Sequence, residues 1–143
     1  DIPPGEAIIQ PFLGSVKTEG EYSFIYFSGE FSHGVKKLPK NGDYRIQSSY
    51  GGYELSYQPT LEERELGSKL LSLLDFVPLY ARVDLLRGDD NNLKLIELEM
   101  IEPYLYLPYS FETNGINNAA ALFANKIRNN LETRQNLVTR NQQ

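Results

Sequence analysis

The sequence predicts an α+β domain in which an antiparallel β-sheet carries helices packed on one face. Two pairs of short β-prone runs, each joined by a glycine-containing turn, predict two hairpins. Two segments with an apolar stripe at helical spacing predict two helices. With 143 residues and 41% hydrophobic content, the chain fits one compact domain with a single core.

The first half of the chain is rich in β-prone residues. A short apolar run at residues 6–13 predicts a strand, and residues 1–5 predict a linker before it. Residues 21–27 and 31–38 predict the two strands of the first hairpin. Residues 39–59 are polar and glycine-rich without a sustained period, so we expect a mobile loop there.

Two helices are expected in the second half. Residues 61–74 predict the better-defined one, because Thr60 and Glu63 match a capping box and leucines recur along one stripe. Residues 119–133 predict the last helix, with an asparagine before them as its cap. Residues 135–143 are polar and predict a frayed tail.

Composition and charge narrow the classes of function. A net charge of -5 and a pI near 4.9 argue against nucleic acid as a partner, since phosphate backbones require a basic surface. No cysteine is present, which excludes thiolate metal sites, and the single histidine, His33, is expected at an exposed hairpin position. No apolar run or signal segment points to a membrane, so we expect a cytoplasmic protein.

The strongest chemical signal lies in the second hairpin, whose predicted strands are residues 79–86 and 93–101. The residues between them include the Asp- and Asn-rich turn 89–92. An antiparallel register about a four-residue loop at 89–92 places Asp84 directly opposite Glu97. Acidic residues of both strands are therefore expected to meet.

Three carboxylates are expected to converge on one face of this hairpin. Because side chains alternate along a strand, Arg82 and Asp84 share a face, as do Glu97 and Glu99. Opposed like charges destabilise a strand pair unless a cation lies between them, and oxygen ligands suit Mg²⁺ or Mn²⁺. A solvent-facing strand that makes ordinary ion pairs with Arg82 would give the same pattern, so both interpretations stay open.

The segments Arg82-Val83-Asp84 and Glu97-Leu98-Glu99 resemble the metal hairpin of ATP-grasp enzymes. They are most similar to the glutathione-synthetase-like ligases, a group that includes the O-ureido-serine ligase of cycloserine biosynthesis. The resemblance implies that residues 6–134 are the C-terminal lobe of an ATP-grasp fold. It also implies that Asp84, Glu97 and Glu99 bind Mg²⁺ or Mn²⁺, although Glu99 stands where the family usually has Asn.

Further positions agree with the family in their order along the chain. Gln10, Phe12 and Leu13 resemble the segment that contacts the adenine of ATP. Glu21 resembles the acid that accepts hydrogen bonds from the ribose hydroxyls, and Glu19 is an alternative.

The resemblance also implies which residues meet the reacting groups. Arg82 would contact the transferred phosphoryl group or the tetrahedral intermediate, a role that suits a planar guanidinium. Lys36-Lys37 and residues 42–45 resemble the strand end and loop that reach phosphate and the acceptor carboxylate, and Lys36 and Arg45 are the candidates for these contacts.

The implied activity is that of an ATP-dependent carboxylate-amine ligase, which forms a carbon-nitrogen bond through an acyl phosphate. Its partners would be ATP, a small-molecule carboxylate, an amine and the remaining N-terminal part of the same enzyme; a homo-oligomer is compatible with the sequence. ATP-grasp proteins hold ATP between two lobes, so we expect the isolated chain to be inactive.

The rival interpretation is a non-enzymatic β-rich metal- or ligand-binding module whose acidic turn at 89–92 binds calcium.

Overall fold

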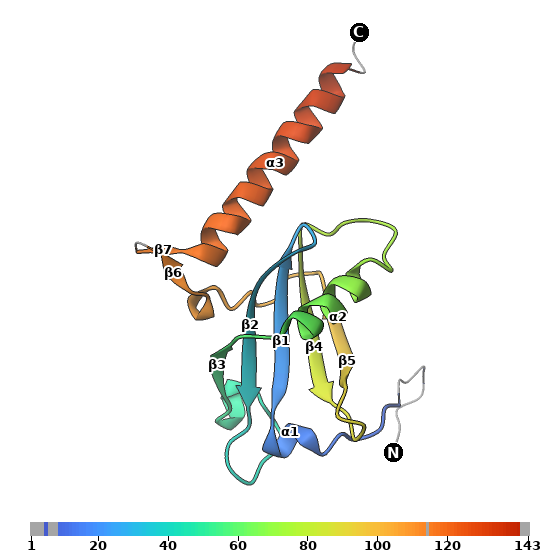
Figure 1. Ribbon diagram of the computed structural model, residues 1–143, viewed down its shortest axis with the longest axis vertical. Coiled ribbons are helices and arrows are strands. Elements are labelled where there is room, and N and C mark those ends of the chain that lie inside the picture. Colours follow the sequence, from blue (N-terminus) through green and yellow to red (C-terminus); the bar gives the residue numbers. More distant parts are fainter. Residues whose placement is uncertain (1–4, 6–8, 114, 141–143) are drawn as a thin grey trace.

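A five-stranded antiparallel sheet forms the centre of the molecule (Figure 1). The computed structural model describes residue 5 and residues 9–113 and 115–140. Along the chain the elements are α1 (Ser15–Thr18), β1 (Glu21–Phe27), β2 (Glu30–Leu38), the 3-10 helix η1 (Ser48–Tyr50), β3 (Tyr53–Tyr57), α2 (Leu61–Leu71), β4 (Tyr80–Arg87), β5 (Leu93–Glu99), the 3-10 helix η2 (Leu107–Tyr109), β6 (Glu112–Thr113), β7 (Ile116–Asn117) and α3 (Asn118–Arg140).

The central strand β1 divides the molecule into two faces. The strand order is β3-β2-β1-β4-β5, and every residue of β1 is buried. Because side chains alternate, Tyr22 and Phe24 project to one face, and Ser23 and Ile25 project to the other. Each face belongs to a different hydrophobic cluster, so both sides of β1 are covered.

Helix α2 covers the first of these faces. Its predicted capping box is confirmed, since the Thr60 hydroxyl accepts from the Glu63 N–H at 3.2 Å and Glu63 Oε2 accepts from the Thr60 N–H at 3.0 Å. The helix ends at Leu71, slightly earlier than expected. Its leucines pack into one cluster with Phe24 and Val83, and this apolar layer anchors the sheet.

Helix α3 contacts the opposite face through its first turns. Phe123 stacks on Phe27 with ring centroids 4.6 Å apart, and Ala119 is buried beside them. The helix then extends away from the sheet (Figure 1) and continues to Arg140, beyond the predicted end near Thr133. Much of the expected frayed tail is therefore helical, and residues 141–143 lie outside the described part of the chain.

The α+β class and the antiparallel sheet are confirmed, but the expectation of helices on one face is wrong, because α2 and α3 cover opposite faces of the sheet. Two further differences lie in the first half of the chain. Residues 9–13 form no strand, and the rest of the predicted strand and linker, residues 1–4 and 6–8, lies outside the described residues. The predicted loop 39–59 contains β3, which pairs with β2 at the edge of the sheet. Its alternating run Tyr53–Tyr57 spans only five residues within a polar, glycine-rich segment, which is too short to stand out as a strand.

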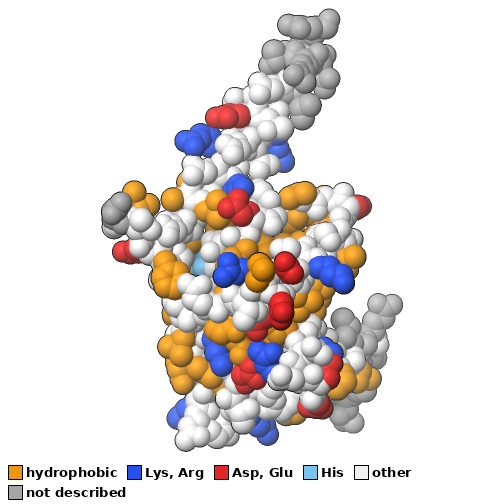
Figure 2. All heavy atoms as spheres, viewed as in Figure 1, with side chains coloured by type: hydrophobic (Ala, Val, Ile, Leu, Met, Phe, Trp, Pro, Cys, Tyr) orange, Lys and Arg blue, Asp and Glu red, His pale blue; other side chains and the backbone are white. Residues whose placement is uncertain are grey.

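The surface is mixed in character. On the face in Figure 2, acidic and basic side chains lie interspersed among apolar ones. Leu73, Phe76 and Val77 are exposed in the segment that connects α2 to β4. Within the described residues, no helix combines the length and the apolar character that a membrane span requires.

Gly67 offers a test of the α2 packing. Replacing a glycine inside a helix by alanine usually stabilises a protein by about 0.5 to 1 kcal/mol. Here a Cβ would overlap the Tyr26 hydroxyl, which donates to the Arg64 carbonyl oxygen at 2.9 Å. We expect Gly67→Ala to lower the free energy of unfolding by about 1 to 3 kcal/mol in urea titrations. Glu65→Ala, at an exposed position of the same helix, should change it by less than about 0.5 kcal/mol; a stabilised Gly67→Ala variant would contradict the packing.

Candidate functional site

Polar side chains from neighbouring strands lie together on the face of the sheet opposite α2. Ser23 of β1 pairs in register with Asp84 of β4, which pairs with Glu97 of β5. Glu21 of β1 pairs with Lys37 of β2. Because paired residues project to the same side of a sheet, these side chains share one surface, which we call the site face.

The predicted pairing of Asp84 with Glu97 is confirmed, although the turn differs from the expected one. The last strand pair joins Arg87 to Leu93, so residues 88–92 connect the strands and the turn is one residue longer than the predicted loop at 89–92. A bulge at Ile96 compensates, because Leu85 pairs with Leu95 whereas Asp84 pairs with Glu97. The bulge restores the register that brings the two acids together.

Asp84, Glu97 and Glu99 form the candidate metal centre. Each offers one carboxylate oxygen, and these oxygens lie within 4.8 Å of one another. Asp84 is fully buried, whereas the Glu97 side chain is 60% exposed and the Glu99 side chain 30% exposed. A set of carboxylate oxygens open to solvent on one side fits a hard divalent cation such as Mg²⁺ or Mn²⁺.

The Arg82 guanidinium lies among the same carboxylates. Its Nε donates to Asp84 Oδ2 at 2.9 Å, and its Nη2 lies 2.8 Å from that oxygen. Nη2 also forms an ion pair with Glu99 and lies 3.7 Å from Glu97 Oε2. Burial disfavours the charged guanidinium, but its hydrogen bond and attraction to Asp84, together with the charge of Glu99, raise the pKa of Arg82. The structure therefore contains the features of both interpretations that the sequence left open: three converging carboxylates, as in a metal site, and ion pairs between these acids and Arg82.

Lys37, rather than the predicted Lys36, is the lysine on the site face. Its ammonium group pairs with Glu21 and lies 3.5 Å from Asp84 Oδ1. Lys36 projects to the opposite face, where its Nζ lies 5.2 Å from the centroid of the Tyr22 ring. The cause is a bulge in β2, because Ile25 pairs with His33 while the next residue of β1 pairs with Phe31. Without this extra residue, Lys36 would lie opposite Glu21.

Glu21, Lys37 and Asp84 are buried together on the site face. Burial raises the pKa of Glu21, although the neighbouring Lys37 opposes the shift. Burial disfavours the charged form of Lys37, but the charges of Asp84 and Glu21 outweigh it and raise the pKa of Lys37. The Ser23 hydroxyl donates to Asp84 Oδ1 at 2.5 Å. Lys37 therefore remains charged near neutral pH and, with Arg82, compensates the buried carboxylate.

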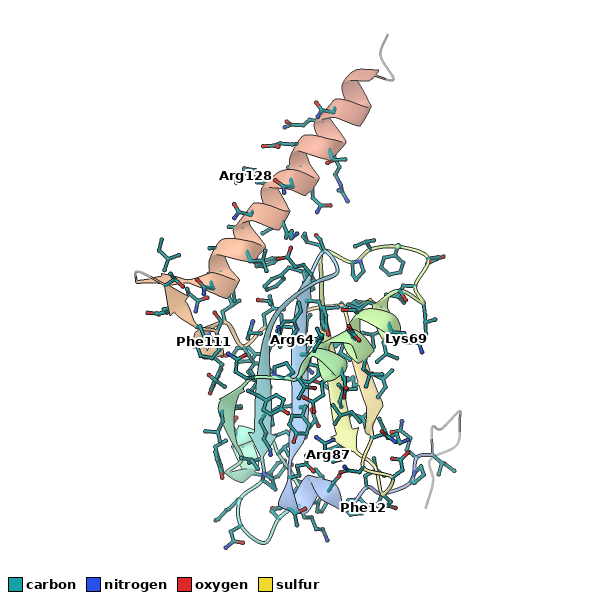
Figure 3. All side chains as sticks on the ribbon, in the orientation of Figure 1. Phe12, Arg64, Lys69, Arg87, Phe111 and Arg128 are labelled. Carbon is teal, nitrogen blue, oxygen red and sulfur yellow. The ribbon has the colours of Figure 1, made fainter. Side chains whose placement is uncertain are left out.

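Glu19, the alternative to Glu21, belongs to a different network. It accepts a hydrogen bond from Tyr22 and another, at 2.6 Å, from Nε of Arg87. Nη2 of Arg87 also pairs with Glu63 of α2 at 3.3 Å, and Figure 3 shows Arg87 at the end of the sheet below α2. This network ties α1, α2 and β4 together on the face opposite the site, so only Glu21 lies on the site face.

Gln10, Phe12 and Leu13 lie together in a pocket of about 400 Å³ at one end of the sheet, where Figure 3 labels Phe12. Leu95 and Ile96 of β5 form another part of its wall. Glu21 does not line this pocket. It lines a second pocket instead, of about 610 Å³.

The larger pocket contains the charged groups of the site face. Its wall includes Glu21, Lys37, Arg82 and Glu97. Ile96 of β5 lines the smaller pocket and Glu97, the next residue, lines the larger one, so both pockets border this strand.

Arg45 lies outside the wall of either pocket. Its Nη2 pairs with Asp43 Oδ2 at 2.7 Å, and its guanidinium lies 4.0 Å from the centroid of the Tyr50 ring. The following residues, Ile46, Gln47 and Ser48, do line the larger pocket. The structure therefore brings the loop, but not the Arg45 guanidinium, to the site.

His33 is buried, with 4% of its surface exposed, and the expected exposed position is wrong. Its Nε2 lies 3.0 Å and 3.1 Å from the carbonyl oxygens of Leu105 and Tyr106. Carbonyl oxygens only accept, so Nε2 carries the proton and Nδ1 accepts from the Ser32 hydroxyl at 2.9 Å. Burial lowers the pKa of His33, which is therefore neutral near pH 7. The histidine fixes the segment that follows β5 onto β2.

Tyr106 is a residue of the site that sequence reasoning did not single out. His33 holds its carbonyl oxygen, and its backbone has a positive φ of 50°. Its ring centroid lies 5.9 Å from the Lys37 ammonium and 6.0 Å from the Arg82 guanidinium. The aromatic ring thus lies beside both cations. The clustering of tyrosines at 104, 106 and 109 is the sequence signal that points to this segment.

The acidic turn at 89–92 has partners within the chain. Asp90 Oδ2 pairs with the Lys94 ammonium at 2.5 Å, and Asp90 Oδ1 accepts from the Asn92 N–H at 3.2 Å. These contacts lower the pKa of Asp90 to about 2. They account for the turn as a structural feature of the hairpin and do not favour a calcium site.

Similarity to known proteins is concentrated in one group of enzymes. No protein-family profile matches the chain. The cycloserine biosynthesis protein DcsG of Streptomyces lavendulae is 29% identical over 124 residues, which are 80% of this chain and 40% of DcsG. The crystal structure of D-cycloserine synthetase DcsG superposes with a TM-score of 0.62 at 27% identity, covering 82% of this chain and 41% of that one.

Two further solved structures share the fold at lower identity. D-alanine–D-alanine ligase from Bacillus anthracis has a TM-score of 0.53 at 16% identity and covers 81% of this chain and 40% of the ligase. The ATP-grasp ligase PsnB, complexed with minimal precursor, Mg and ADP, has a TM-score of 0.53 at 11% identity and covers 78% of this chain and 32% of PsnB. The chain thus spans less than half the length of each of these proteins. It is similar to part of D-cycloserine synthetase DcsG and shares the fold of the ATP-grasp ligase PsnB.

Proposed function

We propose that this chain supplies the metal-binding half of the nucleotide site in an ATP-dependent carboxylate-amine ligase. The observation that carries this proposal is the convergence of Asp84, Glu97 and Glu99 within 4.8 Å beside Lys37 and Arg82. PsnB, which shares the fold, binds Mg and ADP. The proposed site therefore combines acids for a divalent cation with cations for phosphate.

Asp84, Glu97 and Glu99 would hold one or two Mg²⁺ or Mn²⁺ ions. Such an ion supplies charge neutralisation on the phosphate oxygens of ATP. Arg82 pairs with Glu99 through Nη2, and it has to release Glu99 and Glu97 for these acids to become ligands. Its Nε bond to Asp84 can persist meanwhile, so the guanidinium would stay at the site and turn Nη2 toward the transferred phosphoryl group.

The smaller pocket suits the adenine base. Gln10, Phe12 and Leu13 provide an amide and apolar surface there, which match a flat base with polar edges. With the base in this pocket, the polyphosphate would pass from Ile96 to Glu97 and reach the carboxylates, because these adjacent residues line the two pockets. The position of both pockets along β5 supports a nucleotide that spans them.

The basic residues would then take the following roles. Lys37 takes the phosphate role expected of Lys36, because it is the lysine on the site face. Glu21 remains the proposed ribose acid, and its ion pair with Lys37 has to open for the ribose to bind. Arg45 could reach an acceptor carboxylate only after its pair with Asp43 opens.

The full reaction involves more than this chain. The substrate carboxylate would attack the γ-phosphate of ATP to give an acyl phosphate and ADP, and the amine would then attack the acyl carbon with loss of phosphate. The chain's part is to position the phosphates and neutralise their charge. The other lobe of the nucleotide site would come from an N-terminal part of the same enzyme. A cytoplasmic location and a homo-oligomer remain predictions.

Glu97→Gln is the sharpest test of the metal site, because the Glu97 side chain is 60% exposed and its loss should leave the fold intact. We expect Mn²⁺ binding, measured by electron paramagnetic resonance in the presence of ATP on a protein that includes both lobes, to weaken about tenfold or more. ATP turnover should fall with it. Glu65→Gln, on α2, should leave both unchanged. Unaltered Mn²⁺ affinity in Glu97→Gln would refute the assignment.

Arg82→Gln should have the opposite effect on metal binding. Removing the guanidinium frees the carboxylates and removes a positive charge, so Mn²⁺ affinity should rise about threefold to tenfold. ATP turnover should nevertheless fall, because the transferred phosphoryl group loses its contact. Arg82→Lys keeps the charge and should give an intermediate Mn²⁺ affinity. Equal Mn²⁺ affinity in the wild type and Arg82→Gln would show that arginine and metal do not share these acids.

The isolated chain should bind Mg-ATP weakly and show no ligase turnover, because it provides one half of the site. A thermal shift experiment can compare Mg-ATP, Mn-ADP and calcium alone on this chain and on a protein with the N-terminal lobe. We expect nucleotide and divalent metal to act together, with a larger shift in Tm for the longer protein. Stabilisation by calcium alone would favour the non-enzymatic binding module.

A further inference from the structure

Glu54 of β3 is an acid of the larger pocket that lacks a cationic partner. It lies directly opposite Lys37 in the strand pairing. The Lys37 ammonium turns the other way, to Glu21 and Asp84. Within the described residues, Glu54 has no ion pair, and its Oε2 accepts a hydrogen bond from the Tyr109 hydroxyl at 3.2 Å. A negative charge is thus left uncompensated at this end of the pocket.

Aromatic side chains surround this acid. Tyr104, Tyr106 and Tyr109 line the same pocket as Glu54. The Tyr104 and Tyr106 rings are 4.7 Å apart edge to face, and those of Tyr106 and Tyr109 are 6.0 Å apart. Ser56 of β3 donates to the Tyr109 carbonyl oxygen at 2.7 Å, which fixes the tyrosine segment to the strand that carries Glu54. The acid and the rings therefore form one built surface.

The charges of the pocket favour a cation here. Its wall carries the acids Glu21, Glu54 and Glu97 and the cations Lys37 and Arg82. Lys37 pairs with Glu21 and Asp84, and Arg82 pairs with Asp84 and Glu99. A carboxylate ligand near Glu54 would be repelled, whereas an ammonium group would gain an ion pair and the attraction of aromatic faces.

We propose that Glu54 and the three tyrosines form a subsite for the protonated amino group of an amine-bearing substrate. The assignment of this ligand as a ligase substrate rests on the proposed function, but the preference for a cation does not. One carboxylate and the tyrosine hydroxyls offer too few strong ligands for a divalent metal, which requires about six oxygens. An organic ammonium group, which needs one counter-ion and apolar contact, fits the surface better.

The test is an NMR titration of the isotope-labelled chain without nucleotide or metal. The probe is alaninamide hydrochloride, which carries an ammonium group and no carboxylate, and the control is the uncharged N-acetylalaninamide. We expect alaninamide to shift the backbone amide signals of Glu54, Gln47, Ser48, Tyr104 and Tyr109 in a saturable manner. N-acetylalaninamide should leave them in place.

Variants separate the charge from the aromatic surface. Glu54→Gln keeps an acceptor for the Tyr109 hydroxyl and should weaken alaninamide binding about tenfold. Tyr104→Leu removes an exposed ring and should weaken it about threefold, whereas Tyr104→Phe should bind like the wild type. Glu65→Gln, on the other side of the sheet, is the matched control for loss of one acid and should have no effect.

The outcomes distinguish this inference from the proposed ligase function. Equal shifts with both probes, or unchanged binding in Glu54→Gln, would overturn the ammonium subsite even if Mn²⁺ and ATP bind as proposed. Saturable alaninamide binding that Glu54→Gln weakens would support the subsite. If the protein with both lobes then failed to bind Mn²⁺ through Glu97 in the presence of ATP, the ligase proposal alone would fall.

Discussion

Burial of the Asp84 carboxylate is the constraint on which the site face depends. An unpaired carboxylate inside a protein costs several kcal/mol, so the surrounding strands have to supply donors and cations. Ser23 of β1, Lys37 of β2 and Arg82 of β4 do so at 2.5 Å, 3.5 Å and 2.8 Å. This requirement concentrates positive charge where the phosphates of ATP are proposed to bind. The stability of the strands and the chemistry of the site thus draw on the same contacts.

The sheet separates that polar site from the layer that anchors it. On the α2 side, the leucines of the helix and the aromatic residues of β1 form a continuous apolar cluster. On the other side, Tyr106 and the first turns of α3 cover only part of the face and leave the pockets open. His33 holds the Tyr106 segment through two carbonyl oxygens. Substitutions on the site face, such as Glu97→Gln, can therefore alter the chemistry while α2 keeps the sheet folded.

Much of the fold follows from local patterns. The hairpins, the capped helix α2 and the last helix were all predictable, because alternation and helical periodicity are properties of short segments. The edge strand β3 was not, since its alternating run Tyr53–Tyr57 spans only five residues within a polar, glycine-rich segment. The site shows the same limit. Sequence placed Asp84 opposite Glu97 correctly, but through a turn that is one residue shorter than the real one, and only the bulge at Ile96 makes the pairing hold.

The sequence by itself determined that Arg82 and Asp84 share one face of their strand and that Glu97 and Glu99 share one face of theirs, because a strand alternates its side chains wherever it lies. Tertiary structure decided which residues join them. A bulge in β2 selects Lys37, and Glu54 comes to the same pocket on β3. These choices depend on the register between strands that are distant in sequence, and a single inserted residue reverses which side chain faces the site.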